Sequence, residues 1–448
     1  MGIQRKYNIH SAEDRVTQKD KTWSQPLWGG WRKFDEGDGA TAYDSTGNGN
    51  TEIIPKKEMK SLARKLGLRR ILKSGMRHAS NALFHMVHIF RHDISDRVEV
   101  RINGKEVICD VFPCKDNRYI ALIGRYGRLD NPDTMTCVFE SGEVSKCIWI
   151  DDYPHRNEGE QVLICLFPVP EADKRMGATS ISLQTRNGTV LGKLTIHFNV
   201  SPKKYHLTAT TLVRNEERIL REWIEYCRAI GVEHFYIYDN RSLKKNKVRK
   251  LLEPYTEQGI VTLLDWDYLY AKNRKNSRRF CQRGQMHHCL YKYGHLSTWM
   301  FFIDVDEFVF PVDHTQTSVL PLLEKYDQNS EVAALQFKMI WFGNSGHKKV
   351  PEGLIIENYT HRAADVVQEG REKCCVRPDK VELMLIHNVK QYLEGSVKVI
   401  VPPEQYRINH YNTLSAKRRR HRDEQLNVTE DTGMQKFVPL VCQQLRNR

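Results

Sequence analysis

The spacing of hydrophobic residues changes along the 448-residue chain, and each change predicts a different kind of structure. Residues 1–54 are polar and glycine-rich, which predicts an irregular N-terminal arm. Residues 55–95 carry hydrophobic side chains at loosely helical spacing among basic ones, which predicts a basic helical segment. Such a segment either packs on the main body or lies on a membrane surface, and the pattern allows both.

Residues 96–203 follow a period of two, which predicts short β-strands. Runs such as VEVRI, YIALIG and QVLICLF are separated by turn residues, and the dipeptide Asn187-Gly188 lies between two alternating runs. That dipeptide is typical of a two-residue hairpin turn. Several short strands at close intervals predict an antiparallel, β-sandwich-like accessory domain.

From residue 204 to 440 the pattern alternates between strands and helices. The strand runs include LTATTLV, HFYIYD, IVTLLDW and WMFFIDVD, and the helix EERILREWIEYCRAIG is expected to end at Gly231. This alternation predicts an α/β domain with a mostly parallel sheet, whose ligands bind beyond the carboxyl ends of the strands. Because that crevice comes from strands after Tyr205, we expect residues 97–203 to be separable from catalysis.

Three acids end a hydrophobic run in WMFFIDVDEFVFP. Carboxylates are seldom buried unless they are paired or bind a metal. Asp304 and Asp306 alternate, so on an extended chain both point to one face and can share a cation. Mn²⁺ or Mg²⁺ takes few protein carboxylates and completes its shell with phosphate and water oxygens. Since like charges repel, we also expect loss of either carboxylate to raise the melting temperature without metal.

Other polar side chains follow neighbouring strands. Arg214, Asn215 and Glu216 end the first strand, and Asp239 ends the second, where it suits a uracil ring or a ribose hydroxyl. Asn215 and Glu216 also suit the start of the following helix. In contrast, the adjacent histidines at 287 and 288 point in different directions on a helix, so we expect packing or hydrogen bonding there rather than a metal.

The formal net charge is +14, and the basic residues are dense at 56–77 and in KRRRHR at 417–422. Such surfaces suit acidic glycans or anionic membranes, while nucleic acid is not expected because no recognised binding module accompanies them. No hydrophobic run approaches the roughly 20 residues that a membrane helix needs. Five cysteines in the accessory region are either disulfide-bonded or buried thiols, and the sequence leaves both open: Cys109, Cys114, Cys137, Cys147 and Cys165.

Four ordered stretches carry a resemblance: TTLVRNEERILREWIEYCRAIGVEHFYIYDN, FFIDVDEFVFP, CCVRPDKVEL and RINHYNTLS. Over roughly residues 205–415 the chain resembles glycosyltransferase family 92, and within it the plant β-1,4-galactan synthases. The resemblance implies a GT-A fold, a UDP-sugar donor (UDP-galactose), a divalent metal, inversion at the anomeric carbon, a glycan acceptor and a Golgi location. The plant enzymes also have a β-rich module before the catalytic domain.

Carried over by position, the resemblance makes Asp304, Asp306 and His410 the candidate metal ligands. The plant enzymes have a His-His pair after VRP, where an ungapped reading of this chain gives Lys390 and Gln391. His387 lies three residues earlier and is the weaker candidate ligand. The membrane anchor expected of Golgi members is not seen in this chain. Four carboxylates stay open as the catalytic base: Glu307, Glu369, Glu372 and Asp379.

A second function from another class is consistent with the same features. In it, the accessory domain and basic segments bind an acidic glycan, and the transferase domain is catalytically inactive. The intact Asp304, Asp306 and His410 favour the enzyme. Basic groups that can support a leaving diphosphate are Arg278, Arg279 and Lys373.

Overall fold

The computed structural model describes twelve ranges of the chain, and the predicted arm at 1–54 lies outside them. The described residues are 87–92, 97–102, 105–125, 135–150, 162–185, 188, 190–198, 202–243, 245–268, 277–367, 370–411 and 426–446. Most of the predicted helical segment at 55–95 also lies outside. The prediction of a helix is wrong for the last part of this segment, because Val87–His92 form strand β1. This strand pairs antiparallel with β2 (Arg97–Ile102). Pairing with a neighbouring strand outweighs the weak helical spacing of VHIFRH.

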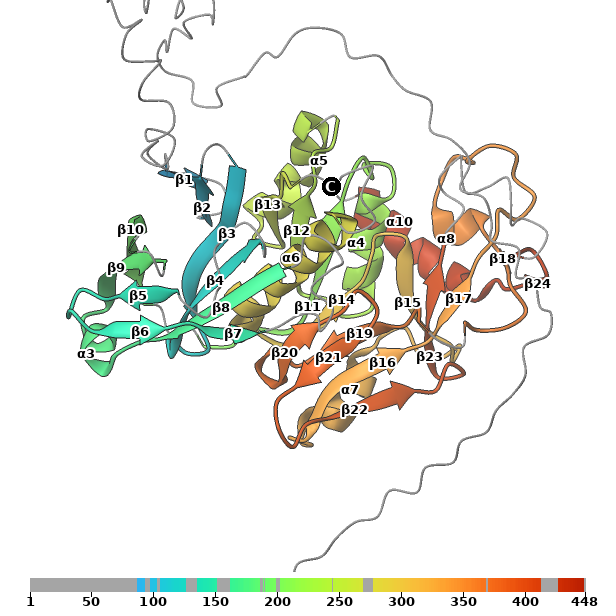
Figure 1. The fold of residues 1–448 in the computed structure, drawn as a ribbon. Helices are drawn as coiled ribbons and strands as arrows, with labels where there is room; N and C mark the ends of the chain where they lie inside the picture. Colours follow the sequence, from blue (N-terminus) through green and yellow to red (C-terminus); the bar gives the residue numbers. More distant parts are fainter. Residues whose placement is uncertain are drawn as a thin grey trace, which may run out of the picture. The chain divides into compact units, whose positions relative to one another are not determined.

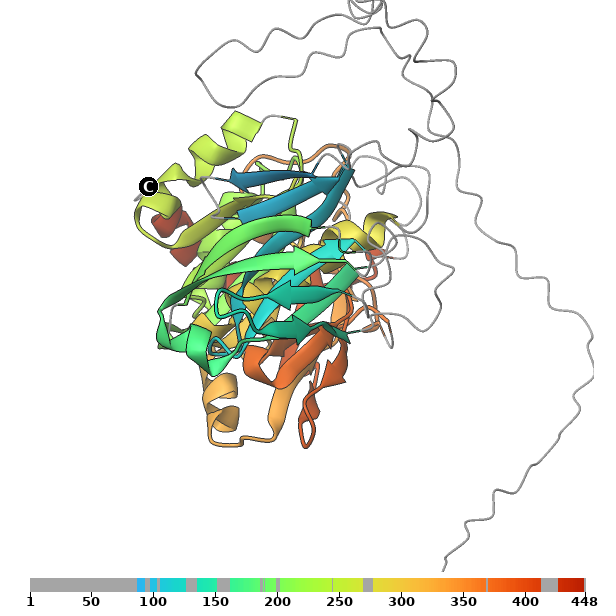
Figure 2. The ribbon, with the colours of Figure 1, turned by 60° about the vertical axis from the view of Figure 1, so that its left-hand side comes forward.

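The first sheet of the accessory region is antiparallel and six-stranded, in the order β1-β2-β3-β4-β8-β7 (Figures 1 and 2). Its remaining strands are β3 (Lys105–Cys114), β4 (Tyr119–Arg125), β7 (Ile148–Ile150) and β8 (Val162–Pro168). A second, four-stranded sheet has the order β10-β9-β5-β6. It contains β5 (Thr136–Val138), β6 (Val144–Lys146), β9 (Ala178–Gln184) and β10 (Val190–His197), with the short helix α3 (Glu171–Arg175) before β9.

The predicted hairpin is confirmed, since β9 and β10 pair antiparallel around the turn that contains Gly188, at a φ of +73°. The two sheets share a buried hydrophobic cluster. Ile120, Leu122 and Leu163 of the larger sheet meet Ile181 and Leu194 of the smaller one. The accessory region is therefore built from two antiparallel sheets with a common core.

A seven-stranded sheet forms the centre of the α/β region, in the order β13-β12-β11-β14-β19-β16-β22. Its strands are β11 (Tyr205–Val213), β12 (His234–Asp239), β13 (Val261–Asp265), β14 (Ser297–Phe302), β16 (Val332–Phe337), β19 (Lys373–Val376) and β22 (Val397–Val401). Strands β11 to β14 pair in parallel, while β19 runs antiparallel to β14 and β16. The predicted, mostly parallel sheet is thus confirmed.

Helices connect these strands. They are α4 (Leu220–Ala229), α5 (Lys245–Glu257), α6 (Ser277–Lys292), α7 (Leu320–Asp327) and α8 (Ile355–Asn358), followed near the end of the chain by α10 (Val438–Arg446). Short 3-10 turns are η4 (Gly294–Leu296), η5 (Pro378–Lys380) and η7 (Gly433–Phe437). Helix α4 ends before Gly231, as predicted. Gly231 has a φ of +116°, and a Cβ there would meet Leu320 at 2.6 Å, so only glycine suits this position.

Smaller sheets complete the region. Strand β23 (Tyr406–His410) lies between β15 (Glu307–Pro311) and β17 (Met339–Trp341). Two further sheets have two strands each. One pairs β18 (His361–Arg362) with β24 (Thr429–Glu430), and the other pairs β20 (Val381–Met384) with β21 (Val389–Tyr392). The register of β15 against β23 sets Glu307 opposite His410. A late segment thereby reaches the acids that follow β14.

The accessory sheet and the α/β region share a second buried cluster. The face of β3, β4 and β8 that is turned away from the four-stranded sheet packs on α6 and the central sheet, with Phe112 and Ile164 meeting Met286 and Leu290. Residues 84–448 accordingly form one compact unit. The expectation that 97–203 is separable from catalysis stays untested, but the structure argues against it, because removing those residues would uncover this core.

The eleven cysteines all lie in the described part of the chain, and all are free thiols in the structure, nine of them buried. For Cys137 burial raises the pKa of the thiol to about 12, which makes it inert near neutral pH. Of the helices in the described ranges, none is both long and apolar enough to cross a lipid bilayer.

Candidate functional site

The carboxyl ends of the parallel strands gather the polar residues that the sequence predicted. Val213, Asp239 and Asp265 are in register at the ends of β11, β12 and β13, and Thr210 is paired with Phe302 near the end of β14. Asp304 follows two residues later. Since parallel strands end at one edge of a sheet, these strand ends lie along one edge, where ligands bind in such sheets.

The turn that carries the acids differs from the expected extended chain. Strand β14 ends at Phe302, and the backbone N–H of Glu307 donates to the carbonyl of Asp304 at 3.1 Å, which closes a tight turn. Asp304 and Asp306 therefore do not alternate on one strand. They are separate corners of a turn, and each has its own side-chain partner.

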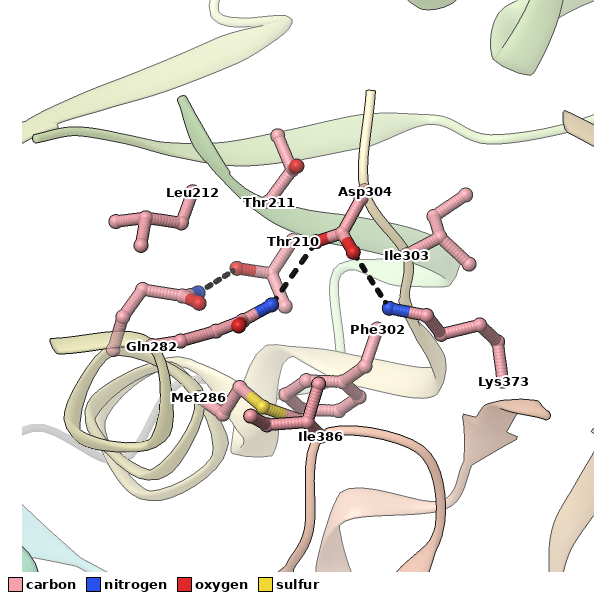
Figure 3. Close-up of a pocket in the computed structure, with 11 residues that line it drawn as sticks. Thr210, Thr211, Leu212, Gln282, Met286, Phe302, Ile303, Asp304, Lys373 and Ile386 are labelled. Atoms are coloured by element: carbon pink, nitrogen blue, oxygen red, sulfur yellow. Dashed lines mark hydrogen bonds and ion pairs between the residues drawn. The ribbon is translucent and has the colours of Figure 1, made fainter. Parts of the chain in front are cut away.

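Asp304 lies between a buried lysine and a glutamine of α6 (Figure 3). Lys373 Nζ donates to Asp304 Oδ2 at 2.8 Å, and Gln282 Nε2 donates to Oδ1 at 3.1 Å. Lys373 begins β19, is 2% exposed and also contacts Glu307 Oε2 at 3.1 Å. Although burial opposes it, the two carboxylates raise the pKa of Lys373, so the lysine stays charged. Lys373 is one of the three predicted basic groups; the side chains of Arg278 and Arg279 lie outside the description.

Glu307 is buried behind the turn. Its Oε2 accepts the backbone N–H of Asp304 at 2.8 Å, and its side chain is 1% exposed. Burial raises the pKa of Glu307 to about 7, against the attraction of Lys373. A carboxylate that is enclosed and already bonded in this way orients the turn. Glu307 therefore lies behind the turn, whereas the side chains of Asp304 and Asp306 are partly exposed.

His410 reaches Asp306 from strand β23. Its Nε2 lies 3.3 Å from Asp306 Oδ2, while Nδ1 faces Met339 Sδ at 3.0 Å and Glu307 Oε1 at 4.0 Å. Burial lowers the pKa of His410, but Asp306 and Glu307 outweigh it and raise the pKa above its ordinary value. The structure thus brings His410 to the acidic turn, where it contacts Asp306.

His387 lies in the turn between β20 and β21, beside Ile386 of the Asp304 pocket. Burial and the nearby Lys373 lower the pKa of His387 to about 4. The Lys390 and Gln391 pair of the ungapped reading is exposed on β21 instead. His387 therefore lies near Lys373 and Asp304, whereas His410 contacts Asp306.

We expect His410→Ala to weaken Mn²⁺-dependent UDP binding about tenfold or more, and His387→Ala to weaken it less. The reason is that His410 has a carboxylate partner at the turn, while His387 lies beside Lys373, whose charge opposes a bound cation. Calorimetric titration of both variants checks this. If the larger loss belongs to His387→Ala, the two ligand roles must be exchanged.

The other predicted donor residues have defined contacts. Asp239 is buried and accepts the backbone N–H of Ser242 at 3.1 Å. Asn215 has a φ of +60°, receives the N–H of Leu243 on Oδ1 at 2.7 Å, and donates its own N–H to Ser242. Arg214 is exposed beside it, and the Glu216 carbonyl accepts the first N–H groups before α4. These bonds fix two strand-end loops to each other at the crevice.

The remaining candidate bases are separated by the fold. Asp379 is exposed on η5 and pairs with Lys203 at 3.4 Å, near the start of β14 and hence at the opposite edge of the sheet. Glu372 is half-buried directly before Lys373. Glu369 lies outside the described residues. The structure thus places Asp379 away from the acidic turn, while Glu372 directly precedes Lys373 in the chain.

The two adjacent histidines of α6 are fully buried hydrogen-bonding residues, as predicted. His287 Nδ1 donates to the Arg283 carbonyl at 2.7 Å, and Nε2 accepts the Met384 N–H at 3.0 Å. His288 contacts Asp110 Oδ2 at 2.8 Å and the Tyr238 hydroxyl at 2.7 Å. Burial lowers the pKa of His287 to about 3 and that of His288 to about 4.

We expect the folded chain to lose stability as pH falls from 6.5 toward 4. The unfolded chain binds protons on His287 and His288 near pH 6.5, whereas the folded chain resists protonation until pH 4 or below, so acid favours unfolding. Urea unfolding of wild type and His287→Gln at several pH values measures this. The slope should fall by up to about 1.4 kcal/mol per pH unit in that variant. The exposed His314→Gln is the control, and an equal slope in all three proteins would contradict the assignment.

Comparison with known proteins adds independent findings. The sequence model of glycosyltransferase family 92 matches residues 204–448. A glycosyltransferase family 92 protein of Oryza sativa subsp. japonica is 27% identical over 64% of this chain and 50% of its own length. The galactan beta-1,4-galactosyltransferase GALS3 of Arabidopsis thaliana is 31% identical over 39% of this chain and 34% of its own. The beta-1,4-galactosyltransferase galt-1 of Caenorhabditis elegans is 26% identical over 40% of each. The chain spans half or less of the length of these relatives.

Proposed function

The chain belongs to glycosyltransferase family 92, and on that premise we propose that it transfers a hexose, namely galactose, from a UDP-sugar to a glycan acceptor. The proposed transfer inverts the anomeric carbon and forms a β-1,4 linkage. Similarity to named β-1,4-galactosyltransferases of a plant and a nematode supports the sugar and the linkage. The observation that carries the proposal is the charged cluster of Asp304, Asp306, Glu307, Lys373 and His410 at the carboxyl edge of parallel strands.

We assign the α/β region to the GT-A type. Support comes from the parallel strands β11 to β14, whose ends carry Asp239 and the acidic turn, and from family membership. In this arrangement the nucleotide lies over the loops after β11 and β12, where Arg214 and Asp239 face a uridine. The diphosphate then extends toward Asp304.

A divalent cation, Mn²⁺ or Mg²⁺, fits the donor set of the acidic turn. Asp304 and Asp306 offer hard carboxylate oxygens with side chains 36% and 22% exposed, and His410 adds an imidazole nitrogen. Within the described ranges, no group of three or more such side chains is already gathered around one point. Once bound, the cation would supply positive charge to the leaving diphosphate.

The remaining steps belong to side chains of the chain itself. Lys373 holds Asp304 and Glu307 in place and keeps a positive charge beside the crevice. In the transfer, an acceptor hydroxyl oxygen forms the new bond to the anomeric carbon as the bond to the β-phosphate oxygen breaks. Its proton passes to a carboxylate on the acceptor side. Among the described carboxylates, we propose the half-buried Glu372, which directly precedes Lys373 in the chain, as this base.

The proposed location is the lumen of the Golgi, which rests on family membership alone. Contact of the basic segment with an anionic membrane remains a prediction, because residues 56–77 lie outside the described part. An acidic polysaccharide acceptor would be attracted by the same charge.

Thermal unfolding with UDP, with and without Mn²⁺, tests the proposal. A specific site should raise the melting temperature by several degrees when both are present, since ligand at 100 times its Kd stabilises by about 2.7 kcal/mol. GDP with Mn²⁺ is the matched control and should do less. A donor and acceptor screen with linkage analysis of the product then identifies the sugar. Indifference to UDP and Mn²⁺ would favour a glycan-binding protein without catalytic activity.

A further inference from the structure

A buried carboxylate of the accessory sheet lies against helix α6. Asp110 on β3 has no solvent exposure. Its Oδ1 accepts the backbone N–H groups of Val98 at 2.7 Å and Val111 at 2.9 Å. Its Oδ2 accepts His288 Nε2 at 2.8 Å and Lys292 Nζ at 2.7 Å, both from α6. One side chain thus joins two strands of the accessory sheet to the helix.

This network specifies a charged aspartate. Burial raises the pKa of Asp110, but Lys292 and His288 outweigh it and lower the pKa to about 2. A buried carboxylate costs several kcal/mol unless donors surround it, and here each oxygen has two. An asparagine would present an amide N–H₂ to His288 and Lys292, which are donors themselves. Replacing Asp110 with asparagine, which has nearly the same shape, is therefore expected to disrupt the network.

The helix that Asp110 holds also carries residues of the proposed donor site. Gln282 donates to Asp304 Oδ1 at 3.1 Å, and Gln285 donates to Thr210 Oγ1 at 2.7 Å. Gln282 precedes His288 by six residues, or about 9 Å along a helix. A helix is rigid over such a distance. Anchoring α6 at His288 therefore fixes the position of Gln282 relative to Asp304.

A second accessory contact ends at the same crevice. Arg97 on β2 donates to Glu99 at 3.3 Å and to the Tyr268 hydroxyl, which itself donates to Glu99 at 3.0 Å. The Tyr268 carbonyl accepts Asn240 Nδ2 at 2.8 Å, and Asn240 directly follows Asp239. The accessory sheet is thus bonded to both sides of the proposed donor site.

We propose that Asp110 is a positioning residue, which acts through α6 and Gln282 to hold the Asp304 carboxylate for the donor. The accessory sheet is then part of the donor site's support, in addition to any role in binding acceptors. This inference rests on the proposed function for its ligand, UDP with Mn²⁺. The positioning of α6 itself does not depend on that ligand.

The experiment is a double-mutant cycle on the full chain with Asp110→Asn and Gln282→Ala. We expect Asp110→Asn to raise the Kd for UDP with Mn²⁺ about fivefold, and to have little further effect when Gln282 is already alanine. Asp173→Asn is the matched control. Asp173 is also a fully buried carboxylate of the accessory region, but it bonds Ser141 and Thr179 within that region. It should lower stability without changing the Kd.

Amide hydrogen exchange without ligand separates this inference from the proposed function. Exchange at residues 281–287 of α6 should rise in Asp110→Asn and not in Asp173→Asn. Lys292→Met serves in the same assays if Asp110→Asn does not fold, and it should change them in the same direction. If wild type does not bind UDP, the proposed function fails. Amide hydrogen exchange of α6 then tests by itself whether Asp110 positions this helix. An unchanged Kd and unchanged α6 exchange, or equal effects of Asp173→Asn, would overturn it.

Discussion

Asp306→Ala will abolish metal-dependent UDP binding and reduce sugar transfer by at least about 10²–10³-fold, with the fold retained. Asp306 is one of two partly exposed carboxylates on the acidic turn and the one that faces His410 at 3.3 Å. Without Asp306, a bound cation would lose one charged ligand, and His410 would lose the carboxylate that holds it in position. Transfer from UDP-galactose, measured with calorimetric titration of UDP and Mn²⁺, checks this result.

Asp304→Ala should lose the same activity but cost more stability than Asp306→Ala. Lys373 is 2% exposed and its charge is balanced by Asp304 and Glu307, so removing Asp304 leaves a buried cation with one counter-charge. This replaces the expectation from sequence that losing either acid raises the melting temperature. The exposed Asp313→Ala is the control and should behave as wild type. Wild-type turnover in Asp306→Ala would end the assignment of the acidic turn as the donor site.

The local part of this site could be predicted from sequence because its signals lie within single elements. A buried run followed by Asp304 indicates a strand end, and strand–helix alternation indicates a parallel sheet whose ends meet. The exact turn could not be predicted, because Ile303 and Val305 read as a continuation of the strand. The hydrogen bond from Glu307 to Asp304 that closes the turn leaves no periodic signal.

The partners of Asp304 and Asp110 lie far from them in sequence. Lys373 is 69 residues from Asp304, and His288 is 178 residues from Asp110. A lysine that ends a loop and a histidine on a helix are common residues, and nothing near either one indicates a buried partner. A hydrophobic pattern can indicate that β3 and α6 each bury a face. It could not show that these two faces bury each other, since any two hydrophobic faces satisfy the same pattern.

That shared interface leads to the second large effect, which concerns the accessory region as a whole. A chain that begins at residue 201 will not fold cooperatively. Phe112, Ile164 and Leu166 of the accessory sheet are at most 4% exposed and pack on Met286 and Leu290. Each such side chain contributes about 1.5–3 kcal/mol when fully buried, while a whole domain is stable by only about 5–15 kcal/mol.

The same truncation also removes Asp110 and Arg97, so that His288, Lys292 and Tyr268 lose their buried partners. The free-energy cost of these unpaired buried donors adds to the stability lost with the hydrophobic contacts. The measurement is thermal unfolding by circular dichroism, together with binding of a dye that reports exposed hydrophobic surface. A chain that begins at Phe84 is the matched control, because it keeps the whole compact unit, and it should unfold cooperatively at the wild-type temperature. A truncated chain from residue 201 that unfolds cooperatively and still binds UDP would show that the α/β region carries its fold alone.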